Sequence, residues 1–581
     1  MDLIDTDVLI VGAGPAGLTA SALLARAGVS AITITKYGGT ADSPRAHITN
    51  QRTVEILRDL AVEDDLRQAA MPQNIMGTQI FATSFAGVEL SRTMAWGAGI
   101  DRRTDYERAS TSAMCNISQH KLEPIILDAA KRHRAEIRFN AELIDLRQDE
   151  KAVTARVRDR LNEREYEIRC KYLIGADGGR STVATATGFE FEGEFNIGEA
   201  ISVWLDADLT KYTAHRSGAI AFITPQSSDI WMSIWPCVTP WTEWNPFFFR
   251  HGWAPGSTEE NVLEGYIREA IGDPEVPFKI KKISRWQVNQ VVATRYRMGR
   301  VFLAGDAAHR HSPANGLGSN TSVQDSYNLA WKLALVLSGR AHEHLLDSYS
   351  EERQPVGRQV INRAMKSHVE IGPWSEAAGL QPSMSKGDAG ANLDELFGNS
   401  ERGEERRTAL LAGIRLMEYQ FNAHGVELGQ RYRSRAVLSA EPFPEYQRDR
   451  ELYFQPDTVA GSHLPHVWVQ RDGKQVSTLD LADYTGFTLL TGIGGQAWDE
   501  AARAVATELG VRIETARVGL RQEIDDLIGE WTQLRDVSDR GCLLVRPDRF
   551  IAWRSRGMPS APAIELRRVM LSLLGRGPAL A

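Results

Sequence analysis

The chain has 581 residues and a mass of 64.5 kDa, which is enough for two or three domains with a large buried core. Its formal net charge of −8 and its pI near 6.0 disfavour nucleic acid and anionic membranes as partners. The four cysteines are scattered without CxxC spacing, which excludes a disulfide scaffold and indicates a reducing, cytoplasmic environment.

The N-terminal segment predicts a dinucleotide-binding unit. An apolar strand over residues 7–11 leads into GAGPAG at residues 12–17, and a helix follows over residues 18–26 until Gly28. A strand, a tight glycine turn and a helix N-terminus together bind a pyrophosphate. Acidic residues precede the uncharged stretch 8–25, and glycine and proline interrupt it, so we expect neither a signal peptide nor a membrane span. The candidate binding residues are Gly12, Gly14, Ala16 and Gly17.

The second predicted strand, residues 31–36, departs from the dinucleotide-binding pattern. An acidic residue is expected at its end, where it binds the ribose hydroxyl groups. Thr35 stands near that place here, and Lys36 follows it. Because a hydroxyl group binds a ribose more weakly than a carboxylate does, we expect a weaker ribose contact at Thr35.

Two further strands end in glycine- and aspartate-containing turns. Residues 172–175 form an apolar strand before ADGGRS at residues 176–181. Residues 301–304 form another strand, which ends at Gly305 and Asp306. A loop opened by Pro313, Gly316 and Gly318 then leads to a helix that we expect to end before Gly339. A strand–loop–helix unit is by itself ordinary scaffold, although a helix start with free N–H groups suits a negative ligand.

Two other kinds of site find no support in the sequence. His309 and His311 have the His-x-His spacing of metal ligands, but no further ligand cluster adjoins them, and we expect no metal. A nucleophilic serine is equally unsupported, because the chain has no G-x-S-x-G motif.

The region between residues 189 and 286 is rich in β-branched and aromatic residues. We expect a sheet there, with each aromatic side chain either in its packing or over an apolar pocket for a hydrophobic ring. Few basic residues lie between Ala219 and Phe249, which favours a neutral phenolic or hydroxypyridine ring over a benzoate. The tryptophans concerned are Trp231, Trp235, Trp241, Trp244 and Trp253.

The C-terminal third changes character. Residues 372–398 are rich in Gly, Ser and Pro and are predicted to be a connector, and residues 404–417 are predicted to be a helix. From about residue 458 a smaller α/β unit is expected, with a strand at 487–491, a helix at 497–509 and a hairpin of 542–545 with 550–553.

Three motifs together resemble a known family. GAGPAG at 12–17, ADGGRS at 176–181 and GDAAHRHSPANGLGSN at 305–320 have the order and separation found in flavin-dependent aromatic hydroxylases of the p-hydroxybenzoate hydroxylase fold. The likeness covers roughly residues 5–369. Residues 44–53 and 320–337 resemble the phenol-oxidising branch, which includes 2-hydroxybiphenyl 3-monooxygenase and 2,4-dichlorophenol 6-monooxygenase. Residues 544–554 resemble the thioredoxin-like C-terminal domain of phenol hydroxylases.

This resemblance implies an α/β (α+β) fold. The expected parts are a Rossmann-like FAD-binding domain (1–70, 101–188 and 285–371), an inserted β-sheet substrate domain (71–100 and 189–284), a connector with helices (372–457) and a thioredoxin-like domain (458–581). The last part lacks CxxC, so we expect it to have a structural or dimer-supporting role.

The resemblance also implies the cofactors and their contacts. FAD would be reduced by NADH or NADPH and would react with O₂. Arg45 and Gln119 match residues that contact the phosphate and ribitol region, Asp306 would hold the ribitol, and Asp177 belongs to a motif that serves FAD and the nicotinamide cofactor. Backbone N–H groups of residues 315–320 would bind the pyrimidine edge of the flavin. In this family the motif that begins with ADGGRS often ends in Arg, at the position where this chain has Ala184. The full cofactor-binding set is Gly12, Gly14, Ala16, Gly17, Thr35, Lys36, Arg45, Gln119, Asp177, Asp306, Pro313, Gly316, Gly318, Ser319 and Asn320.

The expected chemistry transfers oxygen from a flavin C4a-hydroperoxide to an electron-rich ring, and deprotonation of a phenol makes that ring more nucleophilic. His47, which precedes a predicted helix over residues 51–60 capped by Asn50, would be the base; taken alone, it could equally be a structural or capping residue. Asn116 stands where the branch has an aspartate that supports this histidine, and Asp105 or Tyr106 could replace that aspartate. We count Pro313 with the catalytic residues as well.

Three functions remain open. The first is ortho-hydroxylation of a phenol or hydroxypyridine by a cytoplasmic, homodimeric enzyme. The second is a tailoring oxygenase of a larger natural product, acting by aromatic hydroxylation, epoxidation or Baeyer–Villiger chemistry. The third is a non-catalytic flavoprotein, against which the complete loop at 305–320 and His47 both argue.

Overall fold

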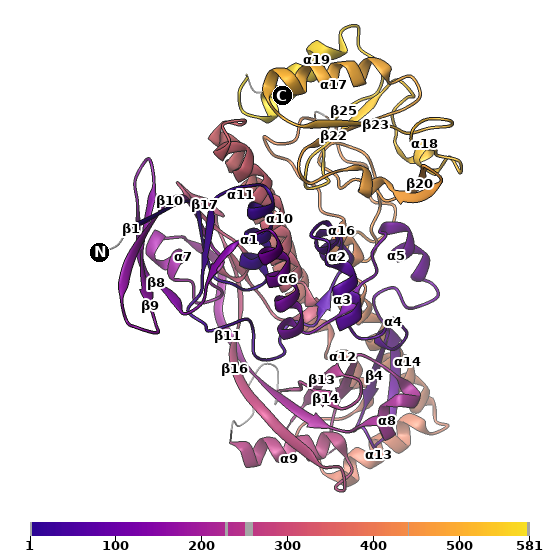
Figure 1. Cartoon of the computed structure of the whole chain (residues 1–581). Coiled ribbons are helices and arrows are strands. Elements are labelled where there is room, and N and C mark those ends of the chain that lie inside the picture. The colour runs from indigo at the N-terminus through magenta and orange to yellow at the C-terminus, as the bar shows by residue number, and fades with distance from the viewer. Residues whose placement is uncertain (1–2, 227–229, 250–258, 440, 578–581) are drawn as a thin grey trace.

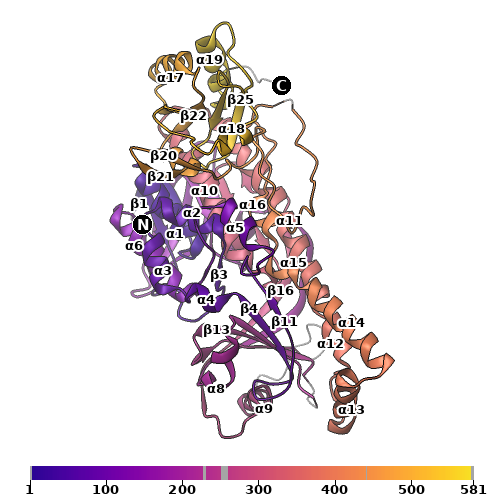
Figure 2. The ribbon, with the colours of Figure 1, turned by 90° about the vertical axis from the view of Figure 1, so that its right-hand side faces the viewer.

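The computed structural model describes residues 3–226, 230–249, 259–439 and 441–577. A mostly parallel sheet with its helices occupies the middle of the molecule, a second sheet lies below it, and a small α/β unit from the C-terminal part lies above it in the view of Figure 1. Figure 2 shows helices α10 and α11 running through the middle region, beside the connector helices. No helix within the described residues is long and apolar enough to cross a membrane.

The first sheet brings together the three strands that precede the sequence motifs. β10 pairs in parallel with β1 and with β18, and β1 pairs in parallel with β2. Val11 is opposite Gly175, and Gly175 is opposite Leu303, so the carboxyl ends of β1, β10 and β18 lie side by side. The strands of this sheet are β1 (Leu3–Val11), β2 (Ala31–Ile34), β7 (Glu136–Arg138), β8 (Ala141–Gln148), β9 (Val153–Asp159), β10 (Glu165–Gly175), β17 (Arg297–Met298) and β18 (Val301–Leu303).

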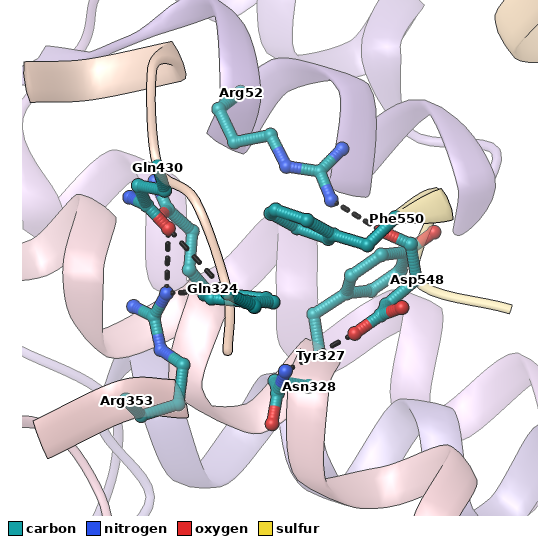
Figure 3. Close-up of a pocket in the computed structure, with 9 residues that line it drawn as sticks. Arg52, Gln324, Tyr327, Asn328, Arg353, Gln430, Asp548 and Phe550 are labelled. Carbon is teal, nitrogen blue, oxygen red and sulfur yellow. Dashed lines mark hydrogen bonds between the residues drawn. The ribbon is translucent and has the colours of Figure 1, made fainter. Parts of the chain in front are cut away.

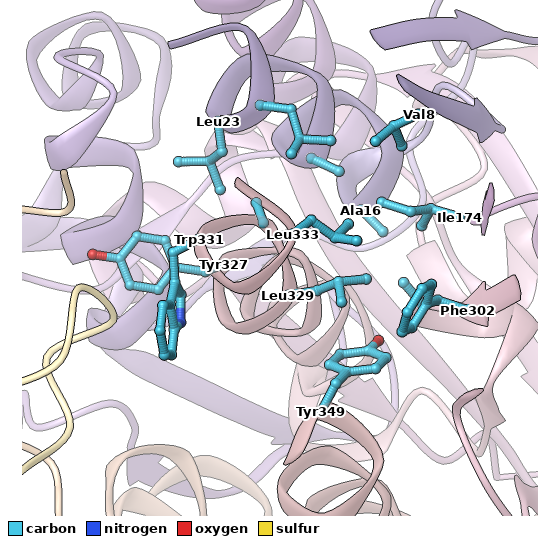
Figure 4. Packing of buried hydrophobic residues seen from close by; sticks show 14 of the residues in the cluster. Val8, Ala16, Leu23, Ile174, Phe302, Tyr327, Leu329, Trp331, Leu333 and Tyr349 are labelled. Carbon is cyan, nitrogen blue, oxygen red and sulfur yellow. The ribbon is translucent and has the colours of Figure 1, made fainter. Parts of the chain in front are cut away.

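Helices cover this sheet and bury its apolar side chains. Figure 4 shows Ala16 and Leu23 of α1 in one packed core with Leu329 of α10 and Ile174 and Phe302 of the sheet. Burial of such side chains stabilises each by about 1.5 to 3 kcal/mol. The helices here are α1 (Pro15–Arg26), α2 (Gln51–Asp59), α3 (Glu63–Ala69), α5 (Arg103–Ala109), α6 (Gln119–Arg132), α7 (Thr182–Thr187), α10 (Gly318–Leu337) and α11 (Asp347–Glu370).

The predicted elements of this domain are confirmed, with shifted ends. Helix α1 begins three residues earlier than expected, at Pro15, because proline is well suited to the first helical turn. Strand β2 ends at Ile34, so Thr35 and Lys36 follow the strand and are not part of it. Asn50 caps α2 as predicted, since its side chain accepts a hydrogen bond from Thr53 N at 3.0 Å.

The second sheet has nine strands and an aromatic core. Trp235 and Trp244 are fully buried, and each packs edge to face on Phe85. Sheet packing is therefore confirmed for these two tryptophans, whereas Trp253 lies outside the described residues. The strands are β4 (Thr78–Ala82), β5 (Glu89–Met94), β11 (Phe191–Ala207), β12 (Ile220–Ile223), β13 (Met232–Thr239), β14 (Glu243–Trp244), β15 (Phe247–Phe249), β16 (Phe278–Ala293) and β19 (His309–Arg310). Its helices are α4 (Gln73–Met76), α8 (Thr210–Thr213) and α9 (Glu260–Ile271).

The connector contains more helix than its composition predicts. Residues 372–398, which their composition predicts to be a connector, include α12 (Pro373–Ala378) and α13 (Lys386–Phe397). Trp374 and Leu393 of these helices are buried in the core of the second sheet. This burial outweighs the low helix propensity of the glycines nearby. The other connector helices are α14 (Glu401–Leu416), α15 (Glu418–Phe421) and α16 (His424–Leu428).

The C-terminal unit has a four-stranded sheet in the order β23-β22-β24-β25. Strand β22 falls on residues 487–491 as predicted, and the predicted hairpin of β24 with β25 is confirmed. Its elements are β22 (Phe487–Thr491), α17 (Gln496–Leu509), β23 (Ile513–Arg517), α18 (Glu530–Leu534), β24 (Cys542–Val545), β25 (Ile551–Ser555) and α19 (Pro562–Leu573), next to a ribbon of β20 (Trp468–Arg471) and β21 (Lys474–Ser477).

A buried ionic network joins this unit to the first domain. Arg546 contacts both carboxylate oxygens of Glu352 on α11, at 2.5 and 2.9 Å, and also pairs with Asp548. Lys332 on α10 contacts the same Glu352 at 2.8 Å. Figure 3 shows Arg52 of α2 donating to the carbonyl oxygen of Asp548, with Phe550 beside it. Each buried charge has a partner of opposite sign, which such groups need in an interior.

Removal of Arg546 should therefore be costly. We expect Arg546→Met to lower the free energy of unfolding by about 3 to 5 kcal/mol, because Glu352 and Asp548 stay buried without that partner. Arg568, whose side chain is 55% exposed beside Glu565, is the control, and Arg568→Ala should cost at most about 1 kcal/mol. Urea denaturation of both variants measures the difference, and equal costs would contradict a docking role for Arg546.

Candidate cofactor and active site

The three motif turns meet at the carboxyl edge of the first sheet. Gly12 has a φ of 110°, and a Cβ there would lie 2.1 Å from the carbonyl oxygen of Ala176. A Cβ at Gly17 would lie 1.8 Å from the carbonyl oxygen of Gly12. The protein itself thus requires glycine at these two positions. Gly14 differs, since the nearest atom to a Cβ there is Glu123 Oε1 at 3.9 Å, and the space above it is open.

Two helices begin at this edge without a side-chain cap. The N-cap residues are Gly14 for α1 and Leu317 for α10, and neither provides a side-chain hydrogen bond. The first N–H groups of a helix lack partners within the helix, and the helix dipole places partial positive charge there. Both helix starts are therefore suited to a phosphate or to the carbonyl edge of a flat ring.

The loop before α10 is fastened to the segment that carries His47. The side chain of Asn320 accepts from Asn50 N at 2.9 Å and donates to the carbonyl oxygens of Ile48 at 2.9 Å and Gly316 at 2.6 Å. These bonds occupy the Asn320 amide, so its side chain holds the loop in place and only its backbone is free for a ligand. Pro313 is exposed at the start of this loop, and Gly318 and Ser319 are half-buried in the first turn of α10.

Charged groups line the same edge. Asp306 is accessible to solvent, although the protein around it raises the pKa of its carboxyl group by desolvation. Arg45 is exposed, makes no hydrogen bond or ion pair with any other described residue, and favours the charged forms of Asp306 and Glu123. Gln119 donates to Glu123 at 2.6 Å. A cation and a carboxylate that face open space beside two helix starts can hold the phosphates and hydroxyl groups of a dinucleotide.

Glu123 was missed in the sequence. It is buried, accepts from Ala41 N at 2.5 Å and lies below Gly14, and burial raises the pKa of its carboxyl group. Its position four residues after Gln119 on a helix whose other inward residues are apolar was the available signal.

Three other candidates have contacts with residues of the protein itself. Asp177 accepts from Ser181 Oγ at 2.6 Å and from Val183 N at 3.1 Å, so its carboxylate stabilises the start of α7. Thr35 is buried, with Tyr37 N 3.4 Å from its hydroxyl oxygen. Lys36 is exposed, with its ammonium nitrogen 5.6 Å from the centre of the Tyr37 ring.

His47, the predicted base, and Asn116, which stands in the place of its supporting aspartate, lie next to each other. The short strands β3 (Ile48–Thr49) and β6 (Cys115–Asn116) are antiparallel neighbours, and Ile117 N donates to the carbonyl oxygen of His47 at 2.7 Å. This ribbon places Nδ1 of His47 at 3.2 Å from Oδ1 of Asn116. Because the amide oxygen only accepts, Nδ1 carries the proton and the lone pair of Nε2 is available to a ligand.

The surroundings keep this imidazole neutral. Burial lowers the pKa of His47 to about 4, and the hydrogen bond that Asn116 accepts from it offsets this only in part. Asp105 does not supply the missing carboxylate: it pairs with Arg448 at 2.8 and 3.0 Å at the surface, and no described hydrogen bond joins it to His47. Tyr106 is buried and stacks on His424, 3.9 Å between ring centres.

The neighbours of the His47 pair, Ile48 in the chain and Met71 beside Asn116, are part of a large apolar cluster. Ile48, Met71, Met114, Trp96 and Phe421 belong to one buried cluster with the core of the second sheet. The amide nitrogen of Asn116 lies 3.6 Å from the sulfur of Met71. A half-exposed imidazole beside such a cluster suits a flat, hydrophobic ring with one polar substituent.

The two other histidines of the loop have structural partners. Nε2 of His309 lies 2.9 Å from Asp325, which also pairs with Arg353 at 2.8 Å. Nδ1 of His311 lies 2.5 Å from the carbonyl oxygen of Ser312. No cluster of three His, Cys, Asp or Glu side chains fit for a metal occurs among the described residues.

Comparison with known proteins agrees with this geometry. Residues 5–364 match the model of an FAD binding domain, and residues 457–577 match that of the aromatic-ring hydroxylase C-terminal domain. The chain is 43% identical to 2,4-dichlorophenol 6-monooxygenase of Delftia acidovorans, over 98% of each protein. It is 40% identical to phenol 2-monooxygenase of a Pseudomonas species, over 98% of this chain and 93% of that protein.

A solved structure gives the same result. The flavin-dependent monooxygenase PieE, in complex with FAD and substrate, superposes with a TM-score of 0.95 at 42% identity and covers 99% of this chain and 100% of its own. The residues at the sheet edge fit FAD, because Gly14 leaves open space where two uncapped helices begin. The chain therefore belongs to the FAD-dependent aromatic-ring hydroxylases, a family of flavoprotein monooxygenases.

Proposed function

We propose that this monooxygenase hydroxylates a phenolic or hydroxypyridine ring, ortho to its hydroxyl group, with NADH or NADPH as reductant. The observation that carries the proposal is the neutral His47 with Nε2 free, next to an apolar cluster and fastened to the flavin loop by Asn320. The names of the two relatives, which act on phenol and 2,4-dichlorophenol, support the same substrate class.

The proposed roles at the cofactor follow from the contacts. FAD, when bound, supplies the activation of O₂ and the transfer of one oxygen atom to the ring. Gly14 would leave room for its pyrophosphate, Gly12 and Gly17 allow the tight turn that places Gly14 there, and Arg45 and Asp306 would hold its phosphate and ribitol. N–H groups at the start of α10 bind its ring edge, and the surrounding apolar side chains exclude water.

His47 accepts the phenolic proton at Nε2 and Asn116 orients its ring. A phenol with a pKa near 10 and an imidazole with a pKa of about 4 differ by about 6 units, or about 8 kcal/mol for complete proton transfer. Such a base shares the proton of an ordinary phenol in a hydrogen bond but deprotonates an acidic phenol more readily. We therefore propose that rings with electron-withdrawing substituents are the better substrates.

The proposal extends to the domains, the assembly and the location of the protein. We propose the domain division at residues 70, 100, 188, 284, 371 and 457, a thioredoxin-like C-terminal unit and a cytoplasmic homodimer without a nucleic-acid partner. The parallel pair β22–β23, flanked by the antiparallel strands β24 and β25, supports the thioredoxin-like assignment.

Purified protein tests the activity directly. NAD(P)H oxidation should rise with phenols, hydroxypyridines or larger phenolic compounds, and mass analysis should find one added oxygen. His47→Gln should retain FAD and lose about 100-fold or more in product formation, because an amide is no base. His344→Gln, at a side chain that is 65% exposed, is the control. Unchanged turnover in His47→Gln would contradict the assigned base.

The cofactor cradle generates a second prediction. Gly14→Ala should leave the stability of the FAD-free protein unchanged and weaken FAD binding by about tenfold or more, because the new methyl group meets only open space in the protein. Gly12→Ala should instead lower that stability, since φ of 110° and the nearby Ala176 oxygen exclude a Cβ. Thermal unfolding without FAD and fluorescence titration with FAD separate the two effects. Equal stability losses in the two variants would contradict the assignment of Gly14 to FAD binding and of Gly12 to the fold.

The uncharged side chain of Asn116, the partner of His47, leads to a third prediction. A carboxylate at residue 116 favours the imidazolium form, so Asn116→Asp should raise the pKa of His47. The variant should then lose kcat/KM as the pH falls between about 7 and 5, where the native protein, with its His47 pKa of about 4, should show no such loss. Its rate on weakly acidic phenols at pH 8 should rise relative to acidic ones. Identical pH profiles would show that Asn116 does not set the charge of His47.

A further inference from the structure

Two non-glycine residues near the site have left-handed backbone conformations. Trp96, which follows β5, has a φ of 53°, and Asn315, in the flavin-facing turn, has a φ of 68°. Such conformations cost free energy in L-residues and persist only where surrounding contacts hold them. Trp96 and Asn315 lie 219 residues apart in sequence, yet one short segment contacts both.

That segment is α15 together with Asn422, which we call the bridging segment (residues 418–422). The side-chain amide of Asn315 donates to the carbonyl oxygens of Tyr419 at 2.5 Å and Gln420 at 3.2 Å. Asn315 is buried, and its own amide oxygen has no partner among the described residues. The side chain of Asn315 thus attaches the flavin-facing turn to the bridging segment, and Leu317 of the same turn is in one apolar cluster with Ala423 and Val426 of the connector.

The other end of the bridging segment holds the Trp96 turn. Trp96 N donates to the carbonyl oxygen of Phe421 at 3.1 Å, and the two rings pack edge to face at 5.8 Å. Asn422 accepts from Gly97 N at 3.1 Å and donates to the carbonyl oxygen of Met94 at 3.1 Å. Asn422 therefore closes both sides of the turn that carries Trp96, whose side chain is buried in the same apolar cluster as Ile48.

The bridging segment is itself firmly anchored. The hydroxyl group of Tyr419 donates to Asp449 at 2.8 Å, and the guanidinium of Arg363 lies 5.0 Å from its ring centre. Phe421 is buried and packs on Phe222 of the second sheet at 5.9 Å. A rigid element that holds two strained turns keeps them at a constant distance from each other.

We infer that Asn315 and Asn422 are positioning residues that hold the flavin-facing turn and the Trp96 turn at a fixed distance from each other. An aromatic ring bound beside Trp96 then lies correctly against the cofactor loop. This inference rests on the proposed function, because it concerns the same aromatic substrate. Loss of either asparagine leaves FAD bound but misaligns the ring, so that reducing equivalents yield hydrogen peroxide instead of hydroxylated product. A displacement of 1 Å in such an arrangement is enough to reduce a rate by about 100-fold.

Three variants test it. Asn315→Gly accepts the φ of 68° without strain but loses both bonds to the bridging segment. Asn422→Ala loses the bonds to Gly97 and Met94, and also the 3.5 Å bond that Asn422 accepts from the hydroxyl group of Tyr106. The matched control is Asn392→Ala, which removes a 2.8 Å bond to the carbonyl oxygen of Gly379 in the same connector, away from both turns. Each variant is measured as holoenzyme for FAD affinity, for the change in flavin absorbance on titration with a phenol in the absence of reductant, and for product formed per NAD(P)H consumed.

We expect Asn315→Gly and Asn422→Ala to bind FAD within about threefold of the native protein, to lose most of the phenol-induced absorbance change and to fall by about fivefold or more in product per NAD(P)H. The double variant should be no worse than the poorer single variant, since both act through one element. Full coupling in Asn315→Gly, or an equal loss in Asn392→Ala, would overturn the inference. Native protein that forms no product on any phenol would overturn the proposed function instead, while its absorbance titration would still test the positioning role.

Discussion

The structure depends on the close contact of three strand ends. The turn after β1 lies so near the turn after β10 that no side chain fits at Gly12, and β18 ends beside them. Each turn comes from a distant part of the sequence, and each leaves backbone groups or a carboxylate facing the same space. The FAD site is a consequence of this parallel pairing, because the carboxyl ends of parallel strands and the helix starts that follow them share one edge.

The second layer of organisation is a set of amide side chains. Asn320 fastens the flavin loop to the His47 segment, Asn116 orients His47, and Asn315 and Asn422 tie the loop and the Trp96 turn to the connector. An amide both donates and accepts and carries no charge, so it can join backbone segments in an apolar site without the desolvation cost of an ion. Burial lowers the pKa of His47, and its hydrogen bond with the uncharged Asn116 offsets this only in part.

The connector and the C-terminal unit are integral parts of the molecule. Arg546 of the C-terminal unit is buried against Glu352 and Lys332 lies at the same carboxylate, so separation of the two bodies would expose or unpair buried charges. Connector helices fill the core of the second sheet with Trp374 and Phe421. The bridging segment also gives the connector a direct contact with the flavin loop.

The sequence alone determined those features that depend on short, local residue patterns. GAGPAG between a strand and a helix, the α10 periodicity and the Asn50 cap were predictable because they depend on backbone conformations and helical spacing within a few residues. The roles of Asp105, Asn320 and Glu123 were not predictable in this way. Asp105 pairs with Arg448, 343 residues away, Asn320 binds Asn50, 270 residues away, and Glu123 accepts from Ala41, 82 residues away. Tertiary structure decided these partners, because a polar side chain bonds to whichever group the fold brings within about 3 Å, and sequence spacing does not encode that distance.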